Sequence, residues 1–144
     1  MTNSLLSTSR SLPIALLRAR ESVMGPIRAL LTDLDVTEQQ WRVLRVLHEE
    51  GPMEPTRISQ QACLLLPSLT RILQKLEDKK LIRRKQDKVD RRRQNVQISA
   101  RGASLIEANL AKNLELLEGV RDRMGEEKYD TLLDLLNELN ASDS

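Results

Sequence analysis

A short run of charged residues in the middle of the chain is well suited to bind another molecule. The stretch 87–99 reads DKVDRRRQNVQIS, with four cations and two aspartates in its first seven residues. Polar and apolar side chains then alternate through Asn95, Val96, Gln97 and Ile98, as in a half-buried strand. Because aspartates suit turn positions, we expect the cations at the tip of a β-hairpin.

The charge of the chain is concentrated around this hairpin. The formal net charge is only +2, yet residues 67–101 hold 12 basic and 4 acidic residues. Such a concentrated positive segment favours a polyanionic partner such as nucleic acid. An ordinary solvated basic face is the alternative, and charge by itself does not separate the two.

The segment before the hairpin adds hydrogen-bond donors to these charges. LPSLTRILQKLEDKKL spaces its apolar residues as one buried face of a helix. Hydroxyl, amide and cationic groups on the other face match the acceptors of base edges and phosphates. Arg71 fits a bidentate contact with guanine, Lys75 fits a phosphate, and neighbouring contacts are expected from Pro67, Ser68, Thr70 and Gln74. The alternatives are a solvated face for the helix and a phosphate contact alone for Arg71.

Helices on either side must position these two segments. An apolar stripe at helical spacing runs over residues 12–34, and TEQQWRVLRVLHEEGP predicts a helix with a Thr37–Gln40 capping box and a stop at Gly51. A short helix, which we expect Thr56 to cap, follows it. Residues 101–144 are helical again, with a break at Gly125.

The order of these elements predicts a mainly α fold with a small β-hairpin wing. Residues 37–100 are interpreted as a winged helix-turn-helix DNA-binding region, whose last helix enters the major groove. The terminal segments 12–34 and 101–144 are too apolar for a monomer of this size. We expect them to form a helical dimerisation region across a two-fold axis. The chain 1–144 is then a single domain.

Composition argues against several other classes of protein. With 40% hydrophobic and 31% charged residues the chain is globular, and no apolar run approaches the ~20 residues of a transmembrane helix. We see no signal peptide, and the single Cys63 excludes an internal disulfide, so a cytoplasmic protein without a membrane partner is expected.

His48 is the only histidine, and no nucleophile–base pair, phosphate loop or carboxylate pair is found. We expect no catalytic residue, metal or cofactor, and an enzyme is not favoured.

The hairpin region resembles a known family of regulators. PSLTRILQKLEDKKLIRRKQDKVDRRRQNVQISARG is similar to the signature of the MarR family, the multiple-antibiotic-resistance regulators. ALLRARESVM, TEQQWRVLRVL and CLLLPSLTRIL further resemble the homoprotocatechuate-operon regulators, which control breakdown of 4-hydroxyphenylacetate. The resemblance implies a homodimeric repressor that leaves its operator when a small aromatic acid binds. An architectural DNA-binding protein without effector control is the alternative.

The family pattern also implies roles for the wing residues. Arg92 is the residue that inserts into the minor groove, where narrow A·T-rich DNA attracts arginine. Asp90 looks like the carboxylate that orients the wing arginines, with Arg91 and Arg93 facing phosphates. The alternative is that Asp90 only caps the turn and pairs with Arg91. One position departs from the pattern, because Lys80 stands where the family usually has a glycine C-cap, so we expect a strained or different cap there.

Candidate effector residues lie on the first two helices. Arg20 interrupts an apolar stripe, and Trp41 begins the second helix with Arg45 following on the same side. A cation and an indole near a helical dimer cleft can hold a carboxylate and a flat ring, so Arg20, Trp41 and Arg45 are the predicted effector-binding residues. The alternative is that Arg20 pairs with an acidic residue of the partner chain and Trp41 belongs to the core.

The single cysteine has a simpler interpretation. Cys63 lies in the apolar segment QACLLL, beside the recognition helix. No neighbouring charge there would stabilise a thiolate, so an oxidant-sensing role is not favoured. We therefore expect Cys63 to be buried in the core.

Overall fold

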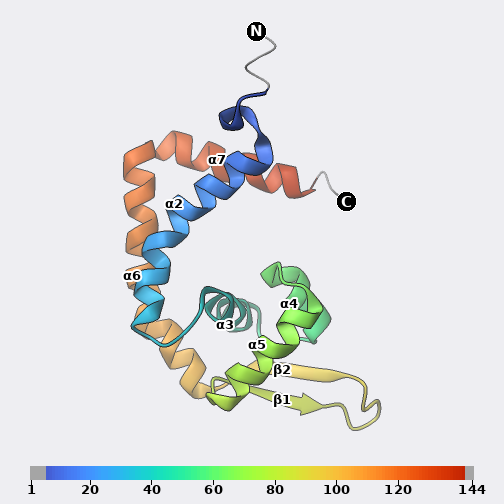
Figure 1. The fold of residues 1–144 in the computed structure, drawn as a ribbon. Helices are drawn as coiled ribbons and strands as arrows, with labels where there is room; N and C mark the ends of the chain where they lie inside the picture. Colours follow the sequence, from blue (N-terminus) through green and yellow to red (C-terminus); the bar gives the residue numbers. More distant parts are fainter. Residues whose placement is uncertain (1–5, 142–144) are drawn as a thin grey trace. The chain divides into compact units, whose positions relative to one another are not determined.

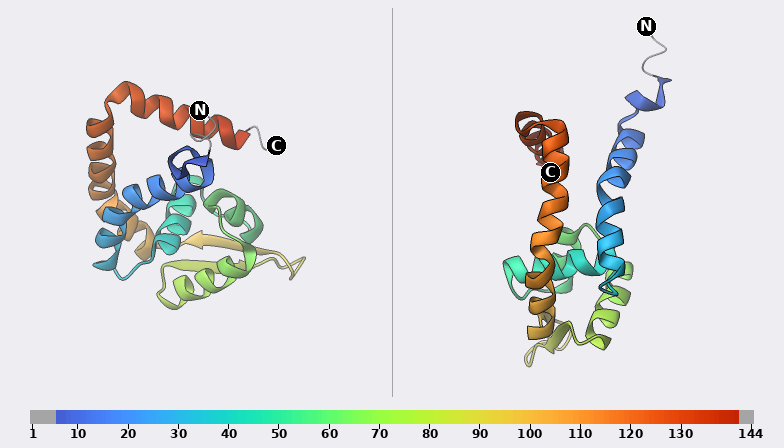
Figure 2. Two further views of the ribbon diagram at one scale, coloured as in Figure 1. Left: turned by 45° about the horizontal axis from the view of Figure 1, so that its top comes forward. Right: turned by 90° about the vertical axis from the view of Figure 1, so that its left-hand side faces the viewer.

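The computed structural model describes residues 6–141, which form two compact units. One unit is Arg28–Ala111, and the other combines the described residues up to Ile27 with those from Lys112 onward. Figures 1 and 2 show their elements. These are η1 (Thr8–Arg10), α2 (Leu12–Thr32), α3 (Glu38–Glu50), α4 (Pro55–Ala62), α5 (Leu66–Asp78), β1 (Ile82–Gln86), β2 (Gln94–Ile98), α6 (Ala100–Met124) and α7 (Glu126–Ala141). The order confirms the predicted mainly α fold with a hairpin wing.

Helix α3 forms as its sequence predicts. The Gln40 backbone N–H donates to Thr37 Oγ1 at 3.1 Å, and the Thr37 N–H donates to Gln40 Oε1 at 3.2 Å, which completes the capping box. Gly51 ends the helix with a φ of 87°, a conformation that glycine adopts without steric cost. Between these ends α3 buries its apolar side, with Leu44 fully inaccessible, and forms the centre of the Arg28–Ala111 unit.

Helix α4 begins earlier than the sequence suggested. Its N-cap residue is Glu54 and Pro55 occupies the first turn, so the prediction that Thr56 caps the helix is wrong. A proline in the first turn has the helical φ already set and needs no hydrogen-bond acceptor for its nitrogen, which explains the earlier start. The Glu54 side chain makes no capping hydrogen bond, so its carboxylate is left for other contacts.

The end of α4 overturns the prediction for the cysteine. Cys63 has a left-handed backbone with a φ of 55° and its side chain is exposed, so the expected burial in the core is wrong. Ala62 instead fills the buried position. Because Cys63 adopts the left-handed conformation at the end of α4, its side chain leaves the helical spacing and is exposed. The spacing of apolar residues in the sequence does not reveal this change of conformation.

Helix α5 ends in a Schellman motif. The Leu81 N–H donates to the Leu76 carbonyl at 2.9 Å, and the Lys80 N–H donates to the Glu77 carbonyl at 2.9 Å. Lys80 itself is left-handed with a φ of 63°. The glycine-type cap is therefore kept although a lysine occupies it, at the cost of local backbone strain.

The wing is a two-stranded antiparallel hairpin that is joined to the helix-turn-helix through its second strand. β1 pairs with β2 from Ile82 opposite Ile98 to Gln86 opposite Gln94. Met53, in the link between α3 and α4, exchanges two backbone hydrogen bonds with Val96, at 2.9 and 3.0 Å. The root of the wing is thus attached directly to the helix-turn-helix.

A serine and a glycine close the root of the wing onto α6. Ser99 Oγ donates to the Lys80 carbonyl at 2.7 Å and accepts the Gly102 N–H at 3.0 Å. A Cβ on Gly102 would collide with the carbonyl oxygen of Leu81, so a side chain there would force the backbone to shift. These contacts explain why Ser99 and Gly102 stand three residues apart directly after the second strand of the wing.

Candidate nucleic-acid interface

The exposed face of α5 carries the residues that the sequence singled out. Leu69, Leu73 and Leu76 are buried, which turns the opposite side of the helix to solvent. Ser68 is half-buried, and the exposed members of the predicted set are Pro67, Thr70, Arg71, Gln74 and Lys75. Thr70 Oγ1 donates to the Leu66 carbonyl at 3.0 Å, so its lone pairs stay available as acceptors. The face therefore presents a guanidinium, an ammonium and polar groups together.

An arginine on the wing fixes the orientation of this helix. Arg84 Nη2 donates to Gln74 Oε1 at 2.8 Å and to Glu77 Oε1 at 2.9 Å, and Gln74 Nε2 donates to Asp78 Oδ1 at 3.0 Å. The hydrogen bond from Arg84 and its positive charge lower the pKa of the Glu77 carboxyl. Gln74 is thus held by its neighbours, and β1 is joined to α5 through charged side chains.

Sequence reasoning did not single out Arg84, although the pattern of β1 contained a signal. Side chains two positions apart in a strand share a face, so Arg84 lies on the same face as the buried Ile82. A cation on that face must find a carboxylate when the strand packs on α5. The Arg84 side chain retains only 19% of its accessible surface, in agreement with this position.

The wing tip is built on two aspartates with different partners. Asp87 Oδ1 accepts the N–H groups of Val89 at 2.8 Å and Asp90 at 3.3 Å, and these bonds lower the pKa of the Asp87 carboxyl. Asp90 Oδ1 accepts both the backbone N–H of Arg92 at 3.1 Å and its Nε at 3.2 Å. Asp90 is therefore paired with Arg92, and the Arg92 side chain, 92% exposed, is oriented by it.

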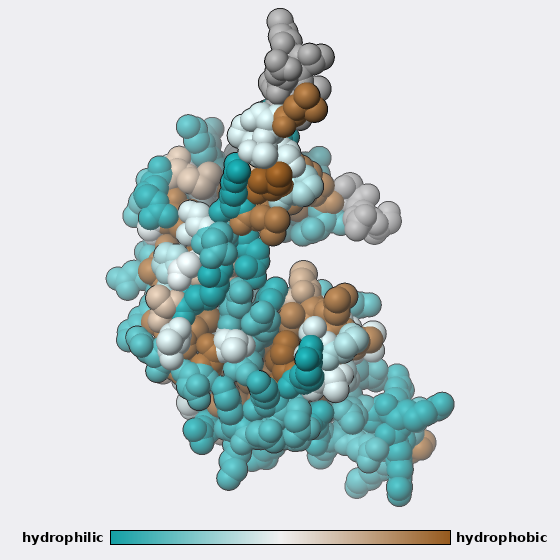
Figure 3. Space-filling model, viewed as in Figure 1, coloured by the Kyte–Doolittle hydropathy of each residue, from teal (hydrophilic) through white to brown (hydrophobic). Residues whose placement is uncertain are grey.

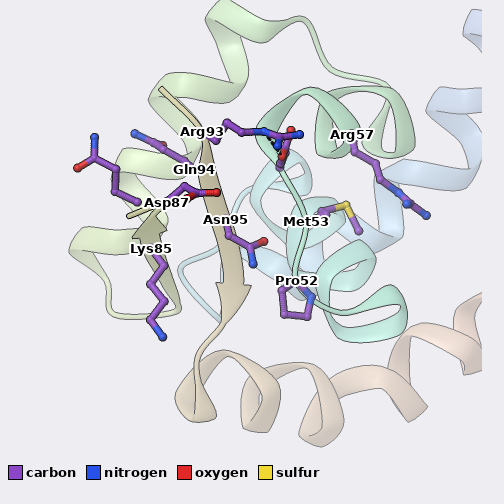
Figure 4. Close-up of a pocket in the computed structure, with 10 residues that line it drawn as sticks. Pro52, Met53, Arg57, Lys85, Asp87, Arg93, Gln94 and Asn95 are labelled. Carbon is purple, nitrogen blue, oxygen red and sulfur yellow. Dashed lines mark ion pairs between the residues drawn. The ribbon is translucent and has the colours of Figure 1, made fainter. Parts of the chain in front are cut away.

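The other two wing arginines have different surroundings. Arg91 is exposed at the tip, and its carbonyl accepts Gln86 Nε2 at 2.6 Å. Arg93 extends back toward the start of α4, where its Nε lies 3.1 Å from Glu54 Oε1 (Figure 4). Figure 3 shows hydrophilic side chains over the hairpin. Arg93 is thus engaged by a carboxylate that sequence reasoning did not consider.

The candidate effector residues are divided between the units. Arg20 is an exposed residue of α2 in the unit formed by the chain ends. Trp41 and Arg45 belong to the Arg28–Ala111 unit, where Trp41 is 6% exposed in the core and Arg45 is half-buried. His48, on the same helix, lies 3.2 Å from Glu107 Oε1 through its Nε2. Arg20, Trp41 and Arg45 therefore stay predicted effector-binding residues.

Two further types of site are not found in the described part of the chain. Residues 6–141 contain no group of three or more His, Cys, Asp or Glu side chains that could hold a metal ion. Over the same residues, none of the helices combines the length and apolar character needed to span a bilayer.

Comparisons with known proteins agree with this geometry. The family model described as the MarR family matches residues 36–93. The chain is 37% identical over 133 residues to the HTH-type transcriptional regulator FarR of Neisseria gonorrhoeae, which covers 92% of this chain and 91% of that protein. It is 34% identical over 131 residues to the homoprotocatechuate degradative operon repressor of Escherichia coli, over 91% of this chain and 88% of that protein.

A solved structure extends the similarity to three dimensions. NadR in complex with 4-hydroxyphenylacetate superposes with a TM-score of 0.77 and 38% sequence identity. The match covers 88% of this chain and 89% of the NadR chain. The similarity therefore includes both the winged helix and the terminal helices.

Proposed function

Because the chain belongs to the MarR family of DNA-binding transcriptional regulators, we propose that it is a homodimeric repressor, released from its operator by a small aromatic carboxylic acid. The observation that carries the proposal is the joint between α5 and the wing. Arg84 holds Gln74 and Glu77 there, so two cation-bearing elements are presented as one surface. A cytoplasmic location, with access to DNA, is part of this proposal, and so is the absence of catalysis.

The DNA contacts follow from the exposed side chains of α5 and the wing. With α5 in the major groove, Arg71 pairs with guanine and Lys75 meets phosphate, while Pro67, Ser68, Thr70 and Gln74 shape the neighbouring contacts. Arg92 enters the minor groove, oriented by Asp90 at 3.2 Å, and Arg91 and Arg93 meet phosphates. The exposure of Arg71 and Arg92 supports this assignment.

Exposed leucines support the homodimer. On α7, Leu132, Leu133, Leu135 and Leu139 are each at least 40% exposed. Soluble proteins rarely leave so many neighbouring leucines in water, and a second copy of the chain can cover them across a two-fold axis. In this proposal the segments 12–34 and 101–144 form the dimerisation region around the DNA-binding region 37–100. A two-fold dimer requires a pseudo-palindromic operator with half-sites ~10 base pairs apart.

The effector is proposed as an acid related to 4-hydroxyphenylacetate. The two relatives that suggest it, the homoprotocatechuate degradative operon repressor and ligand-bound NadR, are 34% and 38% identical to this chain. Arg20 and Arg45 would bind the carboxylate, and Trp41 would contact the ring. Trp41 and Arg45 are four residues apart on α3, which places them on one face of that helix.

A DNA-release assay tests this function. A duplex is first selected by the protein from a random-sequence library, and binding is followed by fluorescence anisotropy. We expect 4-hydroxyphenylacetate or homoprotocatechuate to release the duplex, and the neutral 4-hydroxyphenylacetamide to leave it bound. An architectural DNA-binding protein would ignore all three compounds, and failure to select any duplex would refute DNA recognition itself.

Variants separate the effector residues from the DNA contacts. Arg20→Ala and Arg45→Ala should bind the selected duplex as the native protein does but lose the response to the acid. Arg18→Ala provides a matched control on α2, because Arg18 donates to Thr8 Oγ1 at 3.2 Å and has no assigned role. A normal response in both Arg20→Ala and Arg45→Ala would remove these residues from the effector site.

A further inference from the structure

One of the wing arginines, Arg93, forms an ion pair with Glu54, a carboxylate of the helix-turn-helix. Arg93 Nε lies 3.1 Å from Glu54 Oε1, and the two side chains retain 61% and 49% of their accessible surface. Figure 4 shows Arg93 extending from the wing toward this carboxylate, beside a groove that Arg57 and Lys85 also line. An arginine expected to meet phosphate is therefore already paired within the protein.

The same carboxylate stands at the positive end of a helix. Glu54 is the N-cap residue of α4, a helix of eight residues, and its side chain makes no capping hydrogen bond. A helix N-terminus attracts anions through its unpaired N–H groups and its dipole. Two features that attract a phosphate, the α4 N-terminus and Arg93, are thus both next to one negative side chain.

We propose that Glu54 occupies the place of a DNA phosphate and restrains DNA binding. When a duplex binds, its phosphate displaces the Glu54 carboxylate from Arg93, and the guanidinium then pairs with the DNA. Glu54 is a positioning residue in this scheme, since it acts through Arg93. The inference rests on the proposed DNA-binding function and adds an internal control of its affinity.

The geometry of the ion pair fits displacement. It is joined through one Nε–Oε1 contact at 3.1 Å, and both side chains are about half exposed. Exposed pairs of this kind are weak, whereas an arginine–phosphate contact releases a condensed counterion from DNA. After displacement the Glu54 charge stays close to the phosphate and repels it. Both effects make the native protein bind DNA less tightly than a variant without this charge.

The direction of the effect distinguishes this proposal from its main competitor. Arg93 has further N–H donors, so a phosphate could join the pair while Glu54 holds the guanidinium in place. In that case Glu54 would favour binding, and removal of its charge would weaken binding. Displacement predicts the opposite sign, so one substitution decides between the two mechanisms.

The test compares the native protein with Glu54→Gln in salt titrations of DNA affinity. Two probes are used, the duplex selected from the library and a duplex of shuffled sequence, because a phosphate contact is independent of sequence. We expect Glu54→Gln to bind both duplexes about three- to tenfold more tightly at low salt. Because Arg93 meets a phosphate in both proteins, the slope of log K against log salt should change by less than one per wing.

Four further variants complete the experiment. Glu54→Ser removes the charge but keeps a favourable N-cap residue, so it controls for destabilisation of α4. This variant should also bind DNA more tightly. In an Arg93→Gln background, adding Glu54→Gln should change the affinity much less. Glu49→Gln, the same loss of charge at an exposed residue of α3 to which no role is assigned, should have little effect.

The outcomes separate the inference from the proposed function. Unchanged or weaker binding by both Glu54→Gln and Glu54→Ser would overturn the inference, and so would equal tightening by Glu49→Gln. If the native protein bound neither duplex, the proposed DNA-binding function itself would be refuted.

Discussion

The Arg28–Ala111 unit and the unit formed by the chain ends differ in how completely they bury their apolar side chains. Every strongly buried apolar residue among residues 6–141 except Ile27 belongs to the Arg28–Ala111 unit. The other unit instead leaves leucines of α2 and α7 exposed, with Leu17 at 66% and Leu135 at 56%.

In the proposed homodimer, this difference identifies the part of the fold that depends on a second copy. The Arg28–Ala111 unit closes its own core around Leu44 and Ile58, so one chain supplies what it needs. The chain-end unit has helices but few internal apolar partners, and most helical stability comes from packing. Association of two copies would supply the missing contacts.

The largest expected effect is on the oligomeric state. Leu135→Glu places a charge on the exposed apolar side of α7 and should convert a dimer into a monomer or an aggregate. Leu65→Glu is the matched control, because Leu65 is 78% exposed in the Arg28–Ala111 unit and has no role in the proposed dimer. Light scattering after size exclusion gives the mass of each variant. A dimeric Leu135→Glu protein would contradict the comparison between the units.

A core substitution measures how self-sufficient the Arg28–Ala111 unit is. Leu44 is fully buried, so Leu44→Ala should lower the free energy of unfolding by about 2–5 kcal/mol through lost contacts and a residual cavity. Leu65→Ala should change it by no more than ~0.5 kcal/mol. Urea unfolding of both variants provides the measurement, and equal losses would show that Leu44 does not pack as the structure has it.

Two arginines of the same unit should affect DNA binding differently. Arg71→Ala should cost about 1–3 kcal/mol and relax the preference at one position of each half-site. Arg92→Ala should weaken binding mainly on operators with A·T-rich flanks, because the contact proposed for Arg92 depends on the width and potential of the minor groove. Salt titrations on two operators that differ only in their flanks make the comparison. A flank-independent loss for Arg92→Ala would leave the wing as a basic clamp without groove insertion.

The smallest expected effect concerns the one strained cap near the wing. Lys80 has a φ of 63°, which glycine adopts without the steric cost of a Cβ. Lys80→Gly should therefore raise the free energy of unfolding by about 0.5–1 kcal/mol. Lys80→Ala is a suitable control, since it removes the same side chain but keeps the Cβ and should not give this gain. Destabilisation of both variants would mean that the Lys80 side chain contributes more than its backbone costs.

Local signals in the sequence were sufficient to predict most of the fold. The Thr37–Gln40 capping box, the stop at Gly51 and the break at Gly125 concern residues near one another in the chain, and the structure confirms all three. The burial of Cys63 and the capping role of Thr56 were predicted wrongly, because both depend on where the short helix α4 begins and ends. Apolar spacing alone does not determine those boundaries.

The candidate interface shows the same limit at longer range. The exposed face of α5 could be predicted from the spacing of its leucines. The partners of the cations could not, because Arg84 with Glu77 and Arg93 with Glu54 are joined only by the folding of the hairpin onto the helices. The pattern of β1 indicated that Arg84 needs a carboxylate, but the spacing of residues in the sequence does not identify which carboxylate folding brings to either arginine.

The attachment of the wing has a consequence for how such proteins can diverge. Met53 and Val96 fasten the root of the hairpin to the helix-turn-helix, and the Arg84 contacts fasten its first strand to α5. Residues 87–92 lie beyond these attachments and beyond the Arg93–Glu54 pair, so insertions, deletions or exchanges in that loop leave the register of the strands unchanged. Mutations in this loop can therefore change the contacts with the flanks of an operator without any change in the rest of the protein. Duplicated copies of such a regulator could acquire separate target sets through this loop alone.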